Sequence, residues 1–195
     1  MCILAPSVKG LQKLLDICGS YCERWDIGLN AKKTKNMHFG KKYDDSFRLE
    51  LNGTLIDWVS EWKYLGIVLK SGPTFNCSVK EKIKSFYRSL NGILRVEGQS
   101  DDLILLRLIE AHCLPILTYG IEIIHVAHRD ERRSLRVAYN AIYRRIFKYR
   151  MFESVSNLQR LLGRSTWEEL VEVRCKNFLH RARLCTAGSL VRSFC

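Results

Sequence analysis

The chain has 195 residues, of which 47% are hydrophobic and 27% charged, a composition that is ordinary for a globular domain and excludes a disordered tail. Lysine and arginine number 32 against 20 acidic residues, and the resulting net charge of +12 makes a polyanion, and first of all nucleic acid, the expected partner. No apolar run approaches the roughly 18 to 20 uncharged residues of a membrane helix, and the N-terminus shows no secretory signal, so we expect an intracellular protein with no membrane partner.

Cysteine and histidine do not predict a metal site. The eight cysteines are too sparse for a disulfide scaffold and are expected to be reduced thiols. Cys18 and Cys22 lie four apart on a predicted helix and would bind zinc with His38, but no second pair with ligand spacing follows. His125 and His128 are spaced to share a helix face, and surface histidines are the favoured interpretation.

The first 72 residues predict one helix followed by short strands. Pro6 and Ser7 open a helix whose apolar residues recur at three and four up to Cys22. Alternation between residues 25 and 39 predicts a strand and its turn after that helix. Asn52-Gly53 is a strong hairpin signal between alternating residues. A further strand is expected over residues 62–69, interrupted by Gly66.

From residue 76 onward, almost every segment has helical periodicity. The first helix carries a buried stripe between residues 79 and 94. Ser100 or Asp101 is expected to cap the next helix, residues 103–126, which is apolar nearly all round and is predicted to lie at the centre of a bundle. Pro115 is expected to kink that helix or to split it in two. Further helices are predicted over residues 130–149, 154–162 and 166–184.

The predicted fold class is therefore α+β, with two unlike halves. Residues 1–72 form a small antiparallel sheet with one helix, and residues 73–195 form an all-helical bundle. A small sheet with a single helix has faces that remain to be covered, and the opening residues have the look of a strand entered midway. We therefore expect further sequence upstream.

Four stretches, taken in order, resemble the reverse transcriptases of non-LTR (LINE-type) retrotransposons. They are CILAPSVKGLQKLLDIC (residues 2–18), GLNAKKTKNMHF (28–39), EWKYLGIVL (61–69), and the helical pair LPILTYGIEI (114–123) and NAIYRRIF (140–147). The resemblance implies that residues 1–72 are the C-terminal part of the polymerase palm, including the primer-grip hairpin. It also implies that residues 73–195 are the helical thumb and connection.

The resemblance implies an RNA-directed DNA polymerase as the parent enzyme, but it also places the catalytic residues outside this chain. The family holds Mg²⁺ with an aspartate pair in a Tyr/Phe-Ala-Asp-Asp turn, and the matching residues here begin just past that turn, at Met1. We therefore expect a fragment without a catalytic aspartate pair and without a cofactor of its own, inactive alone. Asp44-Asp45 follows a tyrosine but lies in a polar loop, where aspartate is a common turn residue. Asp101-Asp102 precedes a helix, where capping is the favoured role.

Two groups of residues match functional positions of the family. Lys33 corresponds to the lysine in the loop beside the active site, where it would help to neutralise the departing pyrophosphate; a solvated lysine is the favoured alternative. The primer-grip residues would hold the primer end, with Gly66 allowing close backbone approach, or else their apolar members simply fill the junction between palm and thumb. They are Trp62, Lys63, Tyr64, Leu65 and Gly66.

The stretch from residue 129 to residue 150 carries eight basic residues and two acidic ones, so half of the net charge lies there. Arginines on one helix face can contact phosphates along a duplex, and thumbs of this family lie against the template-primer. A solvated basic face is the alternative. The candidate nucleic-acid-binding residues are Arg129, Arg132, Arg133, Arg136, Arg144, Arg145 and Lys148.

The sequence thus predicts a fragment of a reverse transcriptase that retains contacts to an RNA–DNA or DNA duplex, or to RNA. A missing polymerase portion or another protein chain is the expected protein partner. Two alternatives stay open. One is a host-retained, non-enzymatic helical module that binds RNA or a protein, and the other is a degraded gene copy without a function.

Overall fold

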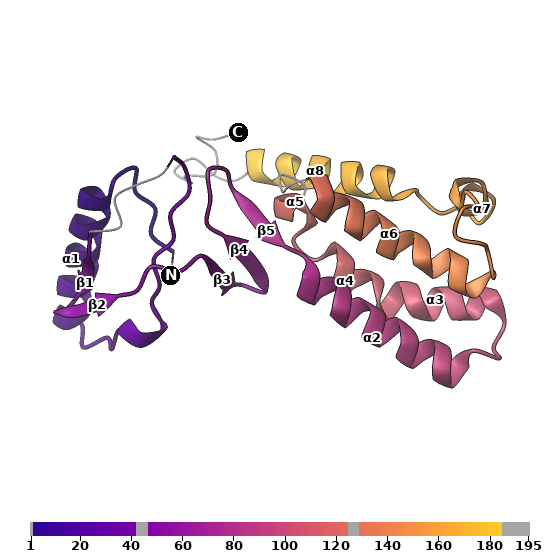
Figure 1. Ribbon diagram of the computed structural model, residues 1–195, viewed down its shortest axis with the longest axis horizontal. Helices are drawn as coiled ribbons and strands as arrows, with labels where there is room; N and C mark the ends of the chain where they lie inside the picture. Colours follow the sequence, from indigo (N-terminus) through magenta and orange to yellow (C-terminus); the bar gives the residue numbers. More distant parts are fainter. Residues whose placement is uncertain (1, 42–46, 125–128, 185–195) are drawn as a thin grey trace. The chain divides into compact units, whose positions relative to one another are not determined.

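The computed structural model describes residues 2–41, 47–124 and 129–184, and the chain divides after Asn76 into two compact units (Figure 1). The first unit holds an α-helix and short antiparallel strands, and the second is largely helical. The predicted α+β class is therefore confirmed. The boundary between the two halves that was expected from the sequence lies after residue 72, four residues before this division.

Helix α1 (Val8–Arg24) is the only long helix in the described part of the first unit. Its N-cap is Ser7, whose hydroxyl accepts a hydrogen bond from the Gly10 N–H at 3.1 Å, as the sequence predicts. The helix buries Leu15, Gly19 and Cys22, which recur at four and three and therefore lie on one face. That face is the one that packs against the strands.

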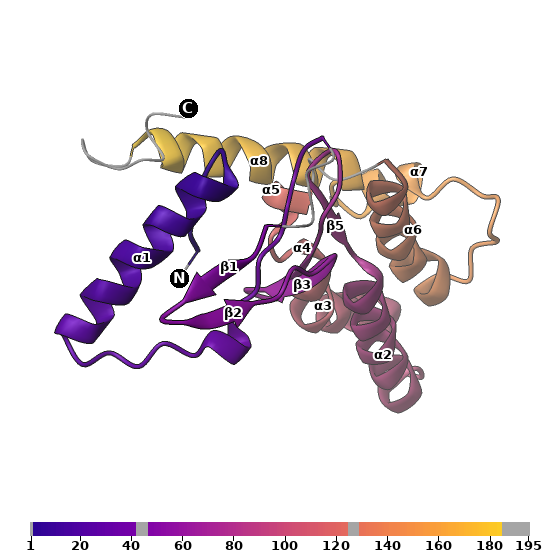
Figure 2. The ribbon, with the colours of Figure 1, turned by 60° about the vertical axis from the view of Figure 1, so that its left-hand side comes forward.

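Strands β1 (Leu49–Leu51) and β2 (Thr54–Ile56) form the predicted hairpin. Asn52 and Gly53 have φ angles of 49° and 71°, the paired left-handed geometry of a type I′ turn, which matches the twist of the two strands. Helix α1 lies alongside this hairpin (Figure 2). Leu15, Leu49, Leu51 and Ile56 meet in a small buried cluster.

The predicted strand over residues 62–69 is in fact two strands. β3 (Glu61–Tyr64) turns back at Leu65 and Gly66 into β4 (Ile67–Lys70), with Tyr64 opposite Ile67. β5 (Asn76–Ser78) completes a three-stranded sheet in the order β3-β4-β5, and the division between the units falls within it. Alternation alone indicated one strand interrupted at Gly66, while the resemblance implied a hairpin; Gly66 is the second residue of the two-residue turn of that hairpin.

The strand predicted between residues 25 and 39 does not form. Ala31–Lys33 is a 3₁₀ turn, whose N-cap Asn30 accepts the Lys33 N–H on its side-chain oxygen at 3.0 Å. Beyond it, the segment makes only isolated bridges, from Asn36 to Trp58 and from Phe39 to Gly72. A side chain that hydrogen-bonds the backbone of a turn competes with the hydrogen bonds between strands. The alternation of apolar and polar residues does not reveal that competition.

The second unit is built from helices that pack around one apolar core. Helix α2 packs against α3, α4 and α6; α3 packs against α4 and α6; and α5 and α6 each contact α8. Their bounds are α2 (Lys80–Glu97), α3 (Asp102–His112), α4 (Leu114–Thr118), α5 (Ile121–Ile124), α6 (Arg129–Ile146), α7 (Ser156–Leu161) and α8 (Trp167–Arg183). Among the fully buried side chains are Phe86, Leu90, Ile109, Leu117, Leu135 and Tyr143.

The long helix predicted over residues 103–126 is split into α3, α4 and α5 within the residues described. Pro115 lies in the first turn of α4, where its missing N–H costs nothing, and Gly120 has a φ of 65° between α4 and α5. Asp101, rather than Ser100, caps α3, with its carboxylate accepting the Leu103 N–H at 2.8 Å.

Helix α6 is shorter than predicted, because it ends at Ile146 and Lys148 has a φ of 55°, a left-handed conformation that no α-helix continues. In the described ranges, no helix combines the length and the apolar character needed to cross a membrane.

Candidate nucleic-acid interface

Four arginines of α6 lie along one side of the helix. Arg129, Arg133, Arg136 and Arg144 follow each other at spacings of four, three and eight residues, which place them on one side; we call them the basic stripe. The first three are exposed and Arg144 is half-buried. The stripe spans about 22 Å of helix axis at 1.5 Å per residue, a length over which about six base pairs would stack.

The apolar face of α6 fixes the direction in which the stripe points. Leu135, Ala138, Ile142 and Ile146 are all buried in the helical core, as their spacing predicts. Tyr139 donates its hydroxyl to the Ser165 carbonyl at 2.7 Å, and a further hydrogen bond of 3.1 Å joins it to the Tyr143 hydroxyl. Burial raises the pKa of both tyrosines, so their hydroxyls stay protonated and keep these hydrogen bonds. Together with the buried apolar side chains, the hydrogen bonds hold the helix in one rotation about its axis.

The members of the stripe differ in their contacts within the chain. The side chains of Arg129 and Arg133 have no hydrogen bond or ion pair within the residues described. Arg136 pairs with Glu168 at 3.3 Å, but both side chains are at least half exposed, and such surface pairs are weak and easily exchanged. Arg144 donates to the Glu153 carbonyl at 3.0 Å, while its buried Nε has no partner in the described part of the chain.

The other three basic candidates lie off the stripe. Arg145 lies over the Tyr87 ring, at 5.1 Å from its centroid, and donates to the Asn91 side chain, so it serves the packing of α6 on α2. Arg132 is exposed on α6, and Lys148 follows the end of that helix. We therefore take Arg129 and Arg133 as the residues that a phosphate backbone would reach with least disturbance of the fold.

The candidate primer-grip residues form the β3–β4 hairpin of the first unit. Trp62 is paired with Leu69 and Lys63 with Val68, and alternation places Trp62 and Tyr64 on one face and Lys63 on the other. Trp62 is 37% exposed, and Lys63 is exposed as well. A shallow open depression of about 480 Å³ is lined by Glu61, Trp62, Lys63 and Val68.

The turn of this hairpin is unusual because a leucine adopts a left-handed conformation. Leu65 and Gly66 have φ angles of 45° and 82°, and a branched, bulky residue pays a conformational cost at the first of these positions. The Leu65 side chain is also 72% exposed. The hairpin therefore presents an apolar side chain at its tip, with Lys63 two residues earlier.

Lys33 lies in the 3₁₀ turn Ala31–Lys33, where its backbone N–H donates to Asn30. Its side chain is exposed. The neighbouring Lys35 forms an ion pair with Asp57. The structure thus gives Lys33 an open position but does not bring it together with the arginines of α6 in one unit.

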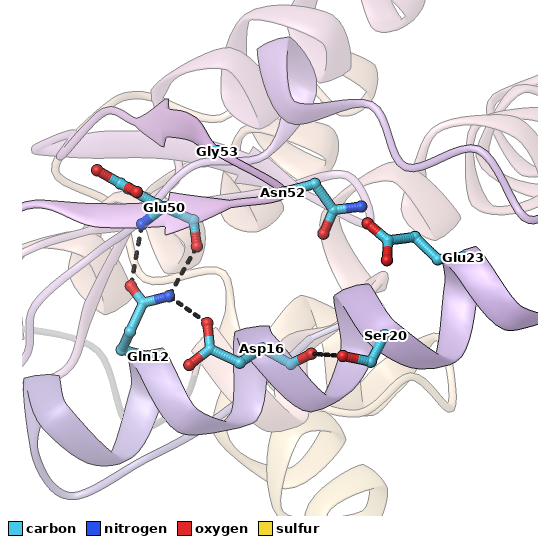
Figure 3. Close-up of a pocket in the computed structure, with 7 residues that line it drawn as sticks. All are labelled: Gln12, Asp16, Ser20, Glu23, Glu50, Asn52 and Gly53. Carbon is cyan, nitrogen blue, oxygen red and sulfur yellow. Dashed lines mark hydrogen bonds between the residues drawn. The ribbon is translucent and has the colours of Figure 1, made fainter.

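A polar hollow of about 240 Å³ lies between α1 and the β1–β2 hairpin (Figure 3). The Gln12 side chain donates to the Glu50 carbonyl at 2.9 Å and accepts the Glu50 N–H at 3.0 Å, so it pairs with the edge of β1 as a strand would. Asp16, Glu23 and Glu50 also line this hollow. Its negative charge is the wrong sign for a phosphate.

Within the residues described, no set of side chains fits a Mg²⁺ site. Mg²⁺ is held through carboxylate oxygens, and no group of three or more His, Cys, Asp or Glu side chains in the described ranges could hold a metal ion. Asp44, Asp45, His125 and His128 lie outside those ranges. Cys18 is half-buried and Cys22 is buried, both as free thiols.

The segment that follows α6 carries a feature that the sequence did not predict. Met151 and Phe152 are 88% and 81% exposed, and they come directly after Arg150 and shortly after Lys148. The sequence did offer a signal for it: two adjacent apolar residues follow basic ones at a place where the apolar spacing of the helix has ended.

Similarity to known proteins places the chain beside RNA-directed DNA polymerases of transposable elements. It is 28% identical over 182 residues to a probable RNA-directed DNA polymerase from transposon BS of Drosophila melanogaster, covering 91% of this chain and 20% of that protein. It is 25% identical over 146 residues to the RNA-directed DNA polymerase from mobile element jockey of Drosophila funebris, covering 73% of this chain and 16% of the relative. The jockey polymerase of Drosophila melanogaster is 26% identical over the same length.

These matches confirm the resemblance to reverse transcriptases of non-LTR elements. The chain spans about a fifth or less of the length of these relatives. No family model matches the sequence. No solved structure matches the fold.

Proposed function

We propose that the second unit holds a nucleic-acid duplex along the basic stripe of α6, as the thumb of an RNA-directed DNA polymerase would. The observation that carries the proposal is the position of Arg129 and Arg133, exposed and one turn apart on a helix whose rotation is fixed by a buried face. Guanidinium groups bind phosphate oxygens bidentately. A row of them tracks a backbone without reading its sequence.

The relatives supply the chemistry of the partner. Their names describe polymerases that act on RNA and DNA, so an RNA–DNA hybrid is the duplex we propose for this chain. The β3–β4 hairpin is the proposed second contact, with Lys63 at a primer phosphate and the backbone of Gly66 close to the primer end. Lys33 keeps its proposed place beside the departing pyrophosphate in a complete enzyme.

This proposal gives the chain a binding role and no chemical step. The residues that carry the resemblance at the proposed contacts are basic, aromatic or apolar, and nucleotidyl transfer by two metal ions needs carboxylates to hold them. A longer polymerase chain, or another protein chain, is proposed to supply those carboxylates and the Mg²⁺. The purified chain should therefore bind a hybrid but leave a primer unextended when nucleotides and Mg²⁺ are added.

Binding of a fluorescently labelled RNA–DNA hybrid, followed by anisotropy at several salt concentrations, tests the proposal. In the double variant Arg129→Gln/Arg133→Gln, we expect the slope of log affinity against log salt to fall by about 2, one unit for each phosphate contact. The matched control is Lys9→Gln/Lys13→Gln, which removes the same charge from two exposed positions four apart on α1.

The control separates a local interface from a general effect of net charge. If both double variants lose equal affinity and salt slope, then any positive charge on the chain contributes to binding, and the proposed interface is wrong. Binding to single-stranded RNA with no binding to the hybrid would instead favour a basic RNA-binding module.

A further inference from the structure

The turn between α6 and α7 presents two adjacent apolar side chains to solvent. Met151 is 88% and Phe152 is 81% exposed. Apolar residues are often exposed singly on protein surfaces, but here two large ones are neighbours at the tip of one turn. A pair of this kind calls for an explanation in terms of a contact.

Hydrogen bonds at the base of the turn hold this tip in place. The Glu153 carboxylate accepts the Arg150 N–H at 2.8 Å, and the Glu153 N–H donates to the Arg150 carbonyl at 3.2 Å. Arg144, the last member of the basic stripe, donates to the Glu153 carbonyl at 3.0 Å. The tip is therefore tied to the end of the stripe, and less conformational freedom is lost when it binds a partner.

The charge around the tip identifies the class of partner. Between residues 144 and 153 the chain has four basic residues and one acidic residue, and the acidic one, Glu153, is turned to the backbone of Arg150. An aromatic side chain that directly follows a basic stretch of the sequence suits a ligand that has flat apolar faces and a negative backbone. Nucleic acid offers both, whereas a second apolar protein surface would leave the exposed Lys148 and Arg150 side chains without an anionic partner.

We propose that Phe152 stacks on an exposed base of the bound nucleic acid, with Met151 packed beside it and with Lys148 and Arg150 on the neighbouring phosphates. This inference rests on the proposed function, because the basic stripe would deliver the duplex to the turn. It adds a contact to the bases, which the stripe does not make. The exposed base is either an unpaired nucleotide beyond the duplex or one at an opened base step.

The test uses the full chain and three probes that carry the fluorescent base 2-aminopurine. The probes are a blunt RNA–DNA hybrid, the same hybrid with a single-stranded extension, and the single strand alone. We expect binding to quench the 2-aminopurine, and we expect Phe152→Ala to remove the quench and to weaken affinity about tenfold. The salt slope should not change in this variant, because no charge is lost. The probe that shows the quench identifies whether the base is unpaired or in an opened step.

Two further variants keep the test specific. Phe152→Trp keeps a stacking surface and should retain both affinity and quench. Val96→Ala removes apolar surface from another exposed position of the same unit, 79% exposed in the last turn of α2, and should change neither. Because the Phe152 and Val96 side chains are both exposed, thermal unfolding should be the same in all three variants, which would show that a loss of binding is not a loss of fold.

The possible failures are distinguishable. If the unaltered chain binds none of the probes, then the proposed function is wrong and this inference falls with it. If the chain binds but Phe152→Ala has the affinity and quench of the unaltered chain, then only this inference is wrong. A Phe152-dependent binding to uncharged phosphatidylcholine vesicles or to a second copy of the chain, with nucleic-acid affinity unchanged, would overturn it in favour of those partners.

Discussion

The two units differ in how completely they bury their apolar residues. The second unit closes a core in which Phe86, Leu90, Ile109 and Leu135 are fully buried. The first unit has a four-residue cluster between α1 and one hairpin, while Ile17 and Tyr21 of the same helix and its C-cap Trp25 are 65%, 58% and 63% exposed. Since burial of apolar area is the dominant favourable term in folding, the second unit is expected to be the more stable of the two.

The comparison also separates two kinds of surface. On the first unit, exposed apolar residues follow one side of α1 at a spacing of four, and an acidic hollow lies between that helix and its hairpin. On the second unit, exposed arginines follow one side of α6. A stable scaffold that presents charge is suited to binding a polyanion without itself changing shape.

The largest expected effect is the loss of the second core by Phe86→Ala. Phe86 is fully buried in α2, so its truncation removes the transfer free energy and leaves a cavity, together about 3 to 5 kcal/mol. Hydrogen exchange read by mass spectrometry should show lost protection in α2, α3 and α6, with α1 unaffected. Loss of protection in α1 as well would show that the two units unfold as one.

Tyr139→Phe should cost less, about 1 to 3 kcal/mol of unfolding free energy. The substitution keeps the ring but removes the hydroxyl, which leaves the Ser165 carbonyl and the Tyr143 hydroxyl without their partner. Urea unfolding of the two proteins measures the difference. A variant as stable as the parent would mean that water replaces these contacts and that α6 is not held through Tyr139.

Alkaline pH should weaken the second unit through Tyr143. Burial raises the pKa of this hydroxyl in the folded state, so above the ordinary tyrosine pKa of about 10 the unfolded chain loses its proton first, and unfolding becomes easier as pH rises. The limiting slope is about 1.4 kcal/mol per pH unit. Tyr143→Phe should show a shallower fall between pH 9 and 11. Burial lowers the pKa of Lys82, which changes stability with pH in the opposite direction. Both proteins contain Lys82, so its contribution cancels when their stabilities are subtracted.

The smallest effect is a gain in the first unit. Leu65→Asn puts at the left-handed position of the β3–β4 turn a residue that tolerates it, and we expect about 0.5 to 1 kcal/mol of added stability, which is less than the full left-handed penalty. Thermal unfolding measures this gain. If stability rises while hybrid binding falls, then Leu65 is kept for its contact at the tip. If stability does not rise, then the turn carries no strain at Leu65.

Local chemistry explains which elements the sequence predicts. Asn52-Gly53 specifies its turn by itself, because both residues accept positive φ. Asp101 and Ser7 cap the helices they precede, and the apolar positions of α6 give its buried face directly. The alternation pattern missed the Leu65-Gly66 turn, which only the resemblance to a primer-grip hairpin implied, because a leucine does not signal a left-handed conformation; the pairing of Tyr64 with Ile67 imposes it.

The parts of the site that the sequence did not predict depend on distant residues. Arg145 has the same local signal as Arg133, and only the placement of Asn91, 54 residues earlier, shows that it is used in packing. The end of α6 at Ile146, by contrast, has a local cause, the left-handed backbone at Lys148. The sequence did not predict it, because the pattern of basic residues continues past the end of the helix. The net charge predicted nucleic acid as the partner. Which of the seven candidate basic residues are free to bind it could be judged only from the fold.

Arginine footprinting tests whether a bound hybrid lies on Arg129 and Arg133. The chain is treated with a phenylglyoxal reagent with and without an RNA–DNA hybrid, and modified arginines are counted by mass spectrometry. The account predicts that the hybrid protects Arg129 and Arg133, while Arg95 and Arg107, exposed on α2 and α3, react at the same rate with and without it. Equal protection of all four, or protection of Arg95 and Arg107 alone, would contradict it.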